Sequence, residues 1–109
     1  MTVKFKRYSE YQGNNLTINK IYTVLGIENN YYRLLGNNYN PCLYNVNQFD
    51  IIDATEEIFW IIEYDEDNNK YAYPLSWNEP GFFEDYHDNV QNIVKQFWSE
   101  YNIYYPKIH

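Results

Sequence analysis

Short apolar runs, separated by clusters of turn-forming residues, constrain the fold of this chain more than any other feature. Glycine, asparagine and proline gather between the runs, where they tolerate a positive φ or fix φ for a tight reversal. The runs are TVKFKRY (2–8), KIYTVLGI (20–27), YYRLL (31–35), CLYNV (42–46), QFDII (48–52), EIFWIIEY (57–64) and KYAYP (70–74). Strands so short and so evenly punctuated predict a small twisted antiparallel barrel or a strongly bent sheet.

The apolar spacing changes to the period of an α-helix near the C-terminus. The helical stripe consists of Val90, Ile93, Val94, Phe97, Trp98 and Tyr101. Asp88 precedes this stripe with Gln91 three residues later, as in a capping box, and Pro106 lies just beyond its far end. The sequence therefore predicts one amphipathic helix over 88–104 that packs on the sheet, and an α+β fold class.

The length of 109 residues is that of one small domain. We expect strands over 1–53, an acidic hairpin and loop over 54–87, and the helix over 88–104. The single cysteine, Cys42, excludes an internal disulfide and a thiolate zinc site, which suits a reducing cytoplasm. No apolar run reaches the length that crosses a bilayer, and the N-terminus lacks the apolar core of a secretory signal. These features predict a cytoplasmic protein with no membrane partner.

The net charge of −7 is unevenly distributed along the chain. Residues 50–88 carry twelve acids and one base, whereas residues 1–49 carry five bases and two acids. A concentrated acidic field repels phosphate backbones and attracts cationic partners. The charge pattern therefore predicts a basic protein partner and no direct binding of nucleic acid.

The segment EPGFFEDYHD (79–88) is the strongest candidate for acid–base chemistry. His87 lies between Asp85 and Asp88, but neighbours in sequence seldom align as a catalytic relay. Nothing in the sequence pairs Cys42 with a histidine as an activated nucleophile. We therefore expect no enzymatic activity.

Two stretches superficially resemble metal sites. DEDNN (65–69) has spaced oxygen ligands, but Lys70 and Ser76 stand where a calcium loop of the EF-hand type needs glycine and glutamate. His87 with Glu84 and Asp88 supplies only one nitrogen and two carboxylates. The sequence predicts a polar hairpin turn at 65–69, and no metal or cofactor.

The stretch LTINKIYTVLGIENNYYRLLGNNYNPCLYNVNQFDIID (16–53) resembles small SH3-like barrel proteins of bacteria and phages. The positions that carry the resemblance are Leu16, Thr17, Lys20, Tyr22, Val24, Tyr31, Tyr32, Arg33, Phe49 and Ile51. EPGFFEDYHD and the helix after it resemble the C-terminal part of similar two-part proteins. The resemblance implies an SH3-like barrel with one C-terminal helix. In size and acidity the chain also resembles immunity proteins of contact-dependent growth inhibition and other polymorphic toxin systems.

This second resemblance implies an immunity protein that neutralises a cognate toxin. A basic nuclease, acting on RNA or DNA, needs a cationic cleft for its substrate, and a surface of carboxylates can occupy that cleft as a phosphate mimic. The candidate partner-binding residues are the acids Asp65, Glu66, Asp67, Glu84 and Asp85 and the aromatic anchors Trp77, Phe83 and Tyr86. We expect a monomer in a 1:1 complex, because the lysines of TVKFKRY (2–8) would protect an exposed strand edge.

A second hypothesis comes from a different functional class. The chain would be a non-enzymatic SH3-like adaptor or regulatory module that binds a peptide or a host protein. Tyr11, Tyr31 and Tyr39 would then line a groove that stacks against a proline-rich segment. The two hypotheses stay open on sequence alone.

Overall fold

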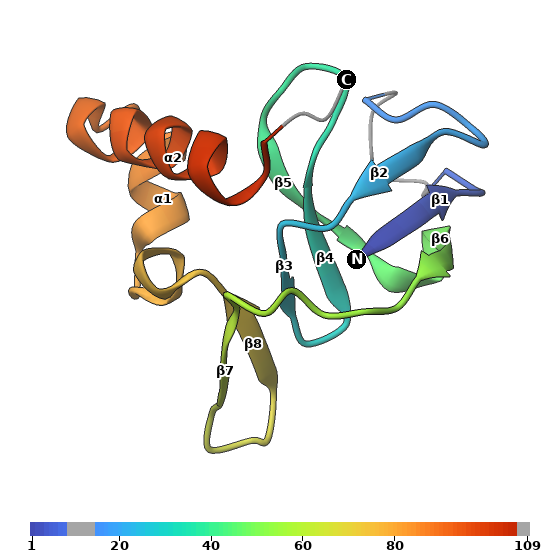
Figure 1. The fold of residues 1–109 in the computed structure, drawn as a ribbon, viewed down its shortest axis with the longest axis horizontal. Coiled ribbons are helices and arrows are strands. Elements are labelled where there is room, and N and C mark those ends of the chain that lie inside the picture. Colours follow the sequence, from blue (N-terminus) through green and yellow to red (C-terminus); the bar gives the residue numbers. More distant parts are fainter. Residues whose placement is uncertain (9–14, 107–109) are drawn as a thin grey trace.

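The chain folds into two antiparallel sheets with two helices at one side of the molecule (Figure 1). The computed structural model describes residues 1–8 and 15–106. The strands are β1 (Thr2–Phe5), β2 (Ile21–Thr23), β3 (Gly26–Glu28), β4 (Tyr31–Leu35), β5 (Pro41–Asn45), β6 (Phe49–Asp53), β7 (Ile61–Tyr64) and β8 (Lys70–Tyr73). The helices are α1 (Phe82–His87) and α2 (Gln91–Tyr104), and two short 3-10 turns are η1 (Val46–Gln48) and η2 (Leu75–Asn78). The predicted α+β class is confirmed.

The strand orders of the two sheets are β2-β1-β6 and β5-β4-β3-β8-β7. β1 lies at the centre of the smaller sheet, so the expectation that TVKFKRY forms an exposed edge is wrong. β6 runs back along β1 and brings Phe49 opposite Phe5. β2 and β6 cover the two edges of β1, and the side chains of Val3 and Phe5 are both buried in the core.

The described strands form two separate sheets that do not close into a barrel. The chain passes from one sheet to the other between β2 and β3. The Val24 N–H donates to Met1 O (3.0 Å) in the smaller sheet, whereas the next N–H, of Leu25, donates to Arg33 O (2.7 Å) in the larger sheet. The backbone therefore changes its hydrogen-bonding partner within one step, and Val24 and Leu25 are both buried at this junction.

A short turn replaces the first half of the strand predicted at 57–64. The Trp60 N–H donates to Glu57 O (3.1 Å), and the extended backbone of β7 begins only at Ile61. The Trp60 ring is buried in the core between the sheets, whereas Ile58 is 99% exposed. Because the turn sends the two apolar side chains in opposite directions, residues 57–60 cannot continue the strand.

Two helices are present where the sequence predicted one. α1 (Phe82–His87) ends at Asp88, whose N–H donates to Glu84 O (2.9 Å). Asn89 then adopts a left-handed conformation with φ 60°, and α2 begins at Gln91 after Val90. The predicted helix start and the capping role of Asp88 are therefore wrong, because the left-handed residue turns the chain between the two helices.

The predicted apolar stripe of α2 faces the aromatic cluster that lies between the helices and the sheets. Phe97 is fully buried, while Ile93, Val94, Trp98 and Tyr101 are partly buried against the same aromatic cluster. The other members of this cluster are Leu25, Tyr73, Trp77, Phe82, Phe83 and Tyr86. No helix in the described part of the chain combines the length and the apolar content needed to span a membrane.

One tyrosine at the end of α2 joins the helices to the rest of the fold. The Tyr105 hydroxyl donates to Leu25 O (2.9 Å) and accepts from the Trp60 Nε1–H (2.8 Å). Leu25 lies at the junction of the two sheets, and Trp60 belongs to the core between them. Burial raises the pKa of Tyr105 above its ordinary value of 10.0, so its hydroxyl remains a donor in alkaline solution as well as at neutral pH.

Candidate functional site: an acidic cleft

The acids at the tip of the β7–β8 hairpin do not have equal roles. Asp65 Oδ1 accepts hydrogen bonds from the N–H groups of Asp67 and Asn69, both at 2.9 Å. These bonds, with the Asn69 N–H contributing most, lower the pKa of the Asp65 carboxyl. Glu66 and Asp67 are exposed at the tip. Asp65 therefore shapes the turn, and its neighbours are free to face a partner.

The three predicted aromatic anchors are buried in the core. Trp77 is 2% exposed, and Phe83 and Tyr86 are each 8% exposed. Trp77 and Phe97 lie 4.7 Å apart between ring centroids, so the Trp77 ring is already occupied by an internal partner. These residues cannot insert into another protein without leaving the core, and their interpretation as projecting anchors is wrong.

The two acids predicted on the helical side lie side by side on α1 but face different surroundings. Glu84 and Asp85 are both exposed, since α1 turns Phe82, Phe83 and Tyr86 toward the core. Glu84 lines the cleft described next, whereas Asp85 does not. This difference gives a matched pair of positions for mutagenesis.

A cleft of about 440 Å³ lies between the β7–β8 hairpin and the segment that runs from η2 into α1. It brings together four of the eight predicted residues, namely Asp65, Trp77, Phe83 and Glu84. The other four, Glu66, Asp67, Asp85 and Tyr86, lie outside its lining. The cleft is thus bordered by acids from two segments that are far apart in the sequence.

Five carboxylates and a single guanidinium line this cleft. The acids are Glu28, Glu63, Asp65, Glu79 and Glu84, and the base is Arg33. Sequence reasoning missed Glu28, Glu63, Glu79 and Arg33 as members of one site. These residues lie close together because β3 pairs with β8, which places Ile27 opposite Ala72. Local sequence patterns do not reveal contacts between residues so far apart in the chain.

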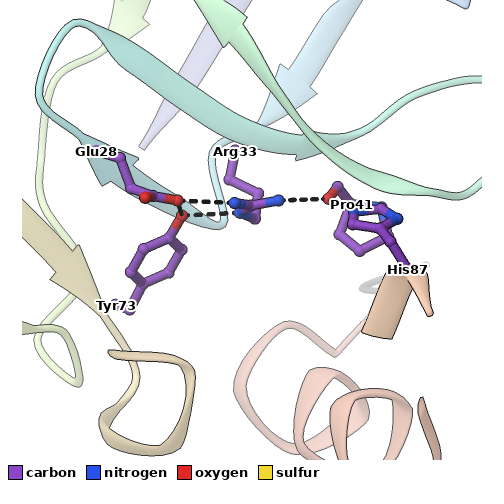
Figure 2. Close-up of polar contacts among 5 residues, drawn as sticks. All are labelled: Glu28, Arg33, Pro41, Tyr73 and His87. Atoms are coloured by element: carbon purple, nitrogen blue, oxygen red, sulfur yellow. Dashed lines mark hydrogen bonds and ion pairs between the residues drawn. The ribbon is translucent and has the colours of Figure 1, made fainter. Parts of the chain in front are cut away.

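The guanidinium of Arg33 forms polar contacts with three residues of the same chain, as Figure 2 shows. Its Nη2 lies 2.7 Å from Glu28 Oε2, its Nε–H donates to the Tyr73 hydroxyl (2.8 Å), and its Nη1–H donates to Pro41 O (2.7 Å). The guanidinium also stacks over the Phe83 ring at 3.8 Å from the centroid. Arg33, on β4, therefore connects this strand to β3, β8 and α1 inside the protein. Because its charge is paired with Glu28, it attracts an external anion only weakly.

Tyr73 completes this network and remains neutral. Its hydroxyl donates to Glu28 Oε2 (2.5 Å). Burial raises the pKa of Tyr73 well above its usual value; the negative charge of Glu28 adds to this, while Arg33 opposes it. Tyr73 therefore acts as a hydrogen-bond donor in the cleft wall.

Besides Asp65, whose carboxylate is engaged in the hairpin turn, three cleft carboxylates form no ion pair with a cation of the described residues. Glu63, Glu79 and Glu84 are exposed, and the ion pairs formed by the described residues do not include them. Their charges add in the concave space of the cleft, where low-dielectric walls strengthen the local field. The cleft can therefore attract an ammonium or guanidinium group from outside.

The remaining candidates for chemistry are dispersed. His87 is exposed, with Nε2 at 3.2 Å from Pro41 O. Within residues 1–8 and 15–106, no group of three or more histidine, cysteine or acidic side chains is arranged to hold a metal ion. Within the described residues, His87 therefore has no neighbouring histidine, cysteine or acidic side chains arranged to bind a metal ion with it.

The proposed tyrosine groove does not assemble as expected. Tyr11 lies outside the described residues. Tyr31 begins β4, whereas Tyr39 lies in the turn beyond the other end of that strand. Tyr39 instead lines a second cleft, of about 560 Å³, together with Tyr22 and Tyr101. Tyr31 is not part of that lining, so Tyr31 and Tyr39 do not share one groove.

The fold and the site define a small α+β protein with an acidic cleft that is lined in part by aromatic rings. No protein-family model matches the chain, and comparisons with curated proteins and with solved structures likewise found no match.

Proposed function

We propose that this protein is a cytoplasmic immunity protein that binds and neutralises a basic toxin, most simply a nuclease, in a 1:1 complex. The observation that carries the proposal is the acidic cleft, in which Glu63, Glu79 and Glu84 form no ion pair with a cation of residues 1–8 or 15–106. A nuclease holds substrate phosphates with lysine and arginine side chains. Carboxylates in a fixed arrangement can occupy the same side chains and thereby exclude the substrate.

The shape of the molecule supports the same proposal. The β7–β8 hairpin projects away from both helices (Figure 1), and its tip carries Glu66 and Asp67. A projecting acidic hairpin beside an acidic cleft offers both a protrusion and a recess to a basic surface. Long-range attraction between such surfaces accelerates association, and this acceleration is reduced by salt.

The test is co-expression with the toxin encoded beside this gene, using growth as the readout. The wild-type chain should protect cells, and Glu84→Lys should weaken both protection and a purified complex, with a Kd increase of about tenfold or more. Asp85→Lys makes the same charge change one residue away, outside the cleft, and should have a much smaller effect.

Two results would contradict the proposal. One is the absence of protection by the wild-type chain; the other is a complex whose association rate does not change with salt. Equal effects of Glu84→Lys and Asp85→Lys would show that net charge matters and the cleft does not.

An adaptor that binds a peptide is the alternative, and the second cleft favours it. The rings of Tyr22, Tyr39 and Tyr101 line this cleft, and Tyr39 is 65% exposed. The resemblance of residues 16–53 to SH3-like barrels belongs to this alternative and stays a prediction. Tyr39→Ala should abolish peptide binding under this function and leave toxin protection unchanged under the first.

A further inference from the structure

β7 (Ile61–Tyr64) is an edge strand with one side open. It pairs with β8 and occupies the end of the five-stranded sheet, and no other strand of the described chain pairs with it. All four of its residues are exposed, whereas β3 and β8 each have two buried residues and no exposed one. Edge strands usually carry proline, a bulge or charged side chains, especially lysine, that prevent further pairing. β7 has no proline or lysine, and Glu63 is its one charged residue, which deters anionic strands but not cationic ones.

The hydrogen-bond pattern identifies which backbone groups face the open side. The Asp65 N–H donates to Asn69 O (3.1 Å), so these residues form a bonded pair, and Lys70 O is used on the opposite side, by the Asn29 N–H (2.7 Å). In an antiparallel ladder bonded and non-bonded pairs alternate. Ile62 and Tyr64, opposite Ala72 and Lys70, therefore direct their N–H and C=O groups away from β8.

The side chains along this edge combine apolar surface with acid. Ile62 is 44% exposed and Tyr64 is 60% exposed, which gives an incoming strand apolar contacts on the face that they share. Glu63 projects between them toward the other face and lines the acidic cleft with Tyr64 and Asp65. A strand added here would lie along the wall of that cleft.

Charge decides which occupant fits this edge. In a symmetric antiparallel pairing with a second copy, a register centred on Glu63 places this carboxylate opposite its own counterpart, and a register centred on Tyr64 places it opposite Asp65 of the other copy; each chain also carries a net charge of −7. Like charges directly across a strand pair are destabilising, whereas opposite charges stabilise it. The edge therefore disfavours a second copy and suits an extended segment with lysine or arginine.

We propose that β7 is a docking edge that accepts an extended, basic, apolar segment of a partner protein as an additional antiparallel strand. The backbone of Ile62 and Tyr64 supplies the hydrogen bonds, and Glu63 and Asp65 select for cationic side chains. That the partner is a toxin rests on the proposed function; the strand addition itself rests on the edge alone.

The test uses the full chain and synthetic peptides as probes. One peptide alternates Lys and Val, and the other has Glu in place of each Lys. Amide hydrogen exchange measured by NMR should slow at Ile62 and Tyr64 by about tenfold or more at saturation with the Lys peptide. The Glu63 amide, which already bonds to β8, should change little and serves as the internal reference. The Glu peptide should produce no protection.

Three variants at one position separate backbone pairing from side-chain contact. Ile62→Pro removes an N–H that β8 does not use, so the hairpin can stay intact while the edge loses a donor. It should weaken binding of the Lys peptide about tenfold or more, whereas Ile62→Val should bind like wild type. Ile62→Lys keeps the backbone N–H but repels a cationic strand, so it gives the same test if circular dichroism shows that Ile62→Pro is unfolded.

Equal binding of the two peptides, protection at the second cleft instead of β7, or equal binding by Ile62→Lys and Ile62→Val would overturn the proposal. So would a dimer of the free chain, seen by sedimentation, that Ile62→Lys dissociates, because the occupant would then be a second copy. Peptide binding at β7 without toxin protection would remove the proposed function alone. Protection by the wild-type chain and by Ile62→Lys, together with no binding of the Lys peptide at β7, would remove the docking edge alone.

Discussion

Arg33 and Glu28 form an ion pair in the wall of the acidic cleft, with 2.7 Å between Nη2 and Oε2 and with the Arg33 side chain only 8% exposed. Gly26, not Glu28, lies directly opposite Arg33 in the β3–β4 ladder, so the pair is diagonal on one face of the sheet. Removing one partner of such a pair leaves the other charge inside the protein without compensation.

Arg33→Met should therefore lower the free energy of unfolding by about 3 kcal/mol. The double variant Arg33→Met/Glu28→Gln removes both charges and should recover part of this loss. Urea unfolding of the single and double variants measures the coupling. Purely additive losses would show that the two side chains contribute independently.

Gly26→Ala should be costly because the added methyl group has no space. A Cβ at this position would lie 2.1 Å from Tyr73 Cδ1 and 2.9 Å from the backbone oxygen of Ala72. The Tyr73 ring is held by Arg33 and Glu28 and cannot move aside, so we expect a loss of about 3 kcal/mol in urea unfolding.

Gly81→Ala is the matched control for that substitution. No atom lies within 4 Å of the added methyl group, and the cost arises only from the left-handed φ of 81°. We expect a loss of about 1 kcal/mol. A larger loss for Gly81→Ala than for Gly26→Ala would contradict the packing described at Tyr73.

Trp77→Ala should lower the free energy of unfolding by about 3–5 kcal/mol, since the ring is buried against Phe97 and Phe83. Leu75, in the same 3-10 turn, is 64% exposed, and Leu75→Ala should change stability by about 0.5 kcal/mol or less. Thermal and urea unfolding distinguish the two. If Trp77→Ala reduced partner binding without reducing stability, the ring would be a surface anchor after all.

The protein should lose stability in alkaline solution through its buried tyrosines. Burial raises the pKa of Tyr44 to about 12, from an ordinary value of 10.0. The folded state therefore holds this proton more tightly than the unfolded state. The resulting stabilisation is complete below about pH 10 and is lost as the pH rises toward 12.

Tyr44→Phe removes this titrating group and should make the decline of the unfolding free energy between pH 10 and pH 12 less steep. Tyr32, Tyr73, Tyr101 and Tyr105, whose pKa values are also raised, should keep part of the slope. Urea unfolding across this pH range is the measurement. An unchanged slope would mean that the Tyr44 phenol is solvated in the folded state.

Local sequence patterns predicted much of the secondary structure. The spacing of Phe97 and its neighbours identified α2, because burial on one face leaves a helical period in the sequence. The break at Asn89 was missed, since asparagine tolerates both helical and left-handed conformations and the choice is made by packing. The separation into two sheets was missed because local patterns do not show which strand each backbone group pairs with. The Val24 N–H bonds to Met1 in one sheet, and the Leu25 N–H bonds to Arg33 in the other.

The candidate site was predictable in its charge but not in its geometry. Twelve acids within residues 50–88 predict an acidic surface without showing which of these acids share it. Composition also cannot tell which rings are exposed: Trp77 is buried, whereas Tyr64 lies open on the edge strand. Glu28 and Glu63 join the cleft only through the pairing of β3, β8 and β7.

The hydroxyl of Tyr105, which links Leu25 to Trp60, has a consequence for synthesis on the ribosome. The eight strands of the described residues all precede this residue in the chain, so the sheets can form while their contact with the helices is still missing. Until α2 docks, the rings of Tyr73, Trp77 and Phe83 lack the cover of Phe97. A chain in which α2 has not yet docked would therefore expose an aromatic face, and docking of α2 covers it.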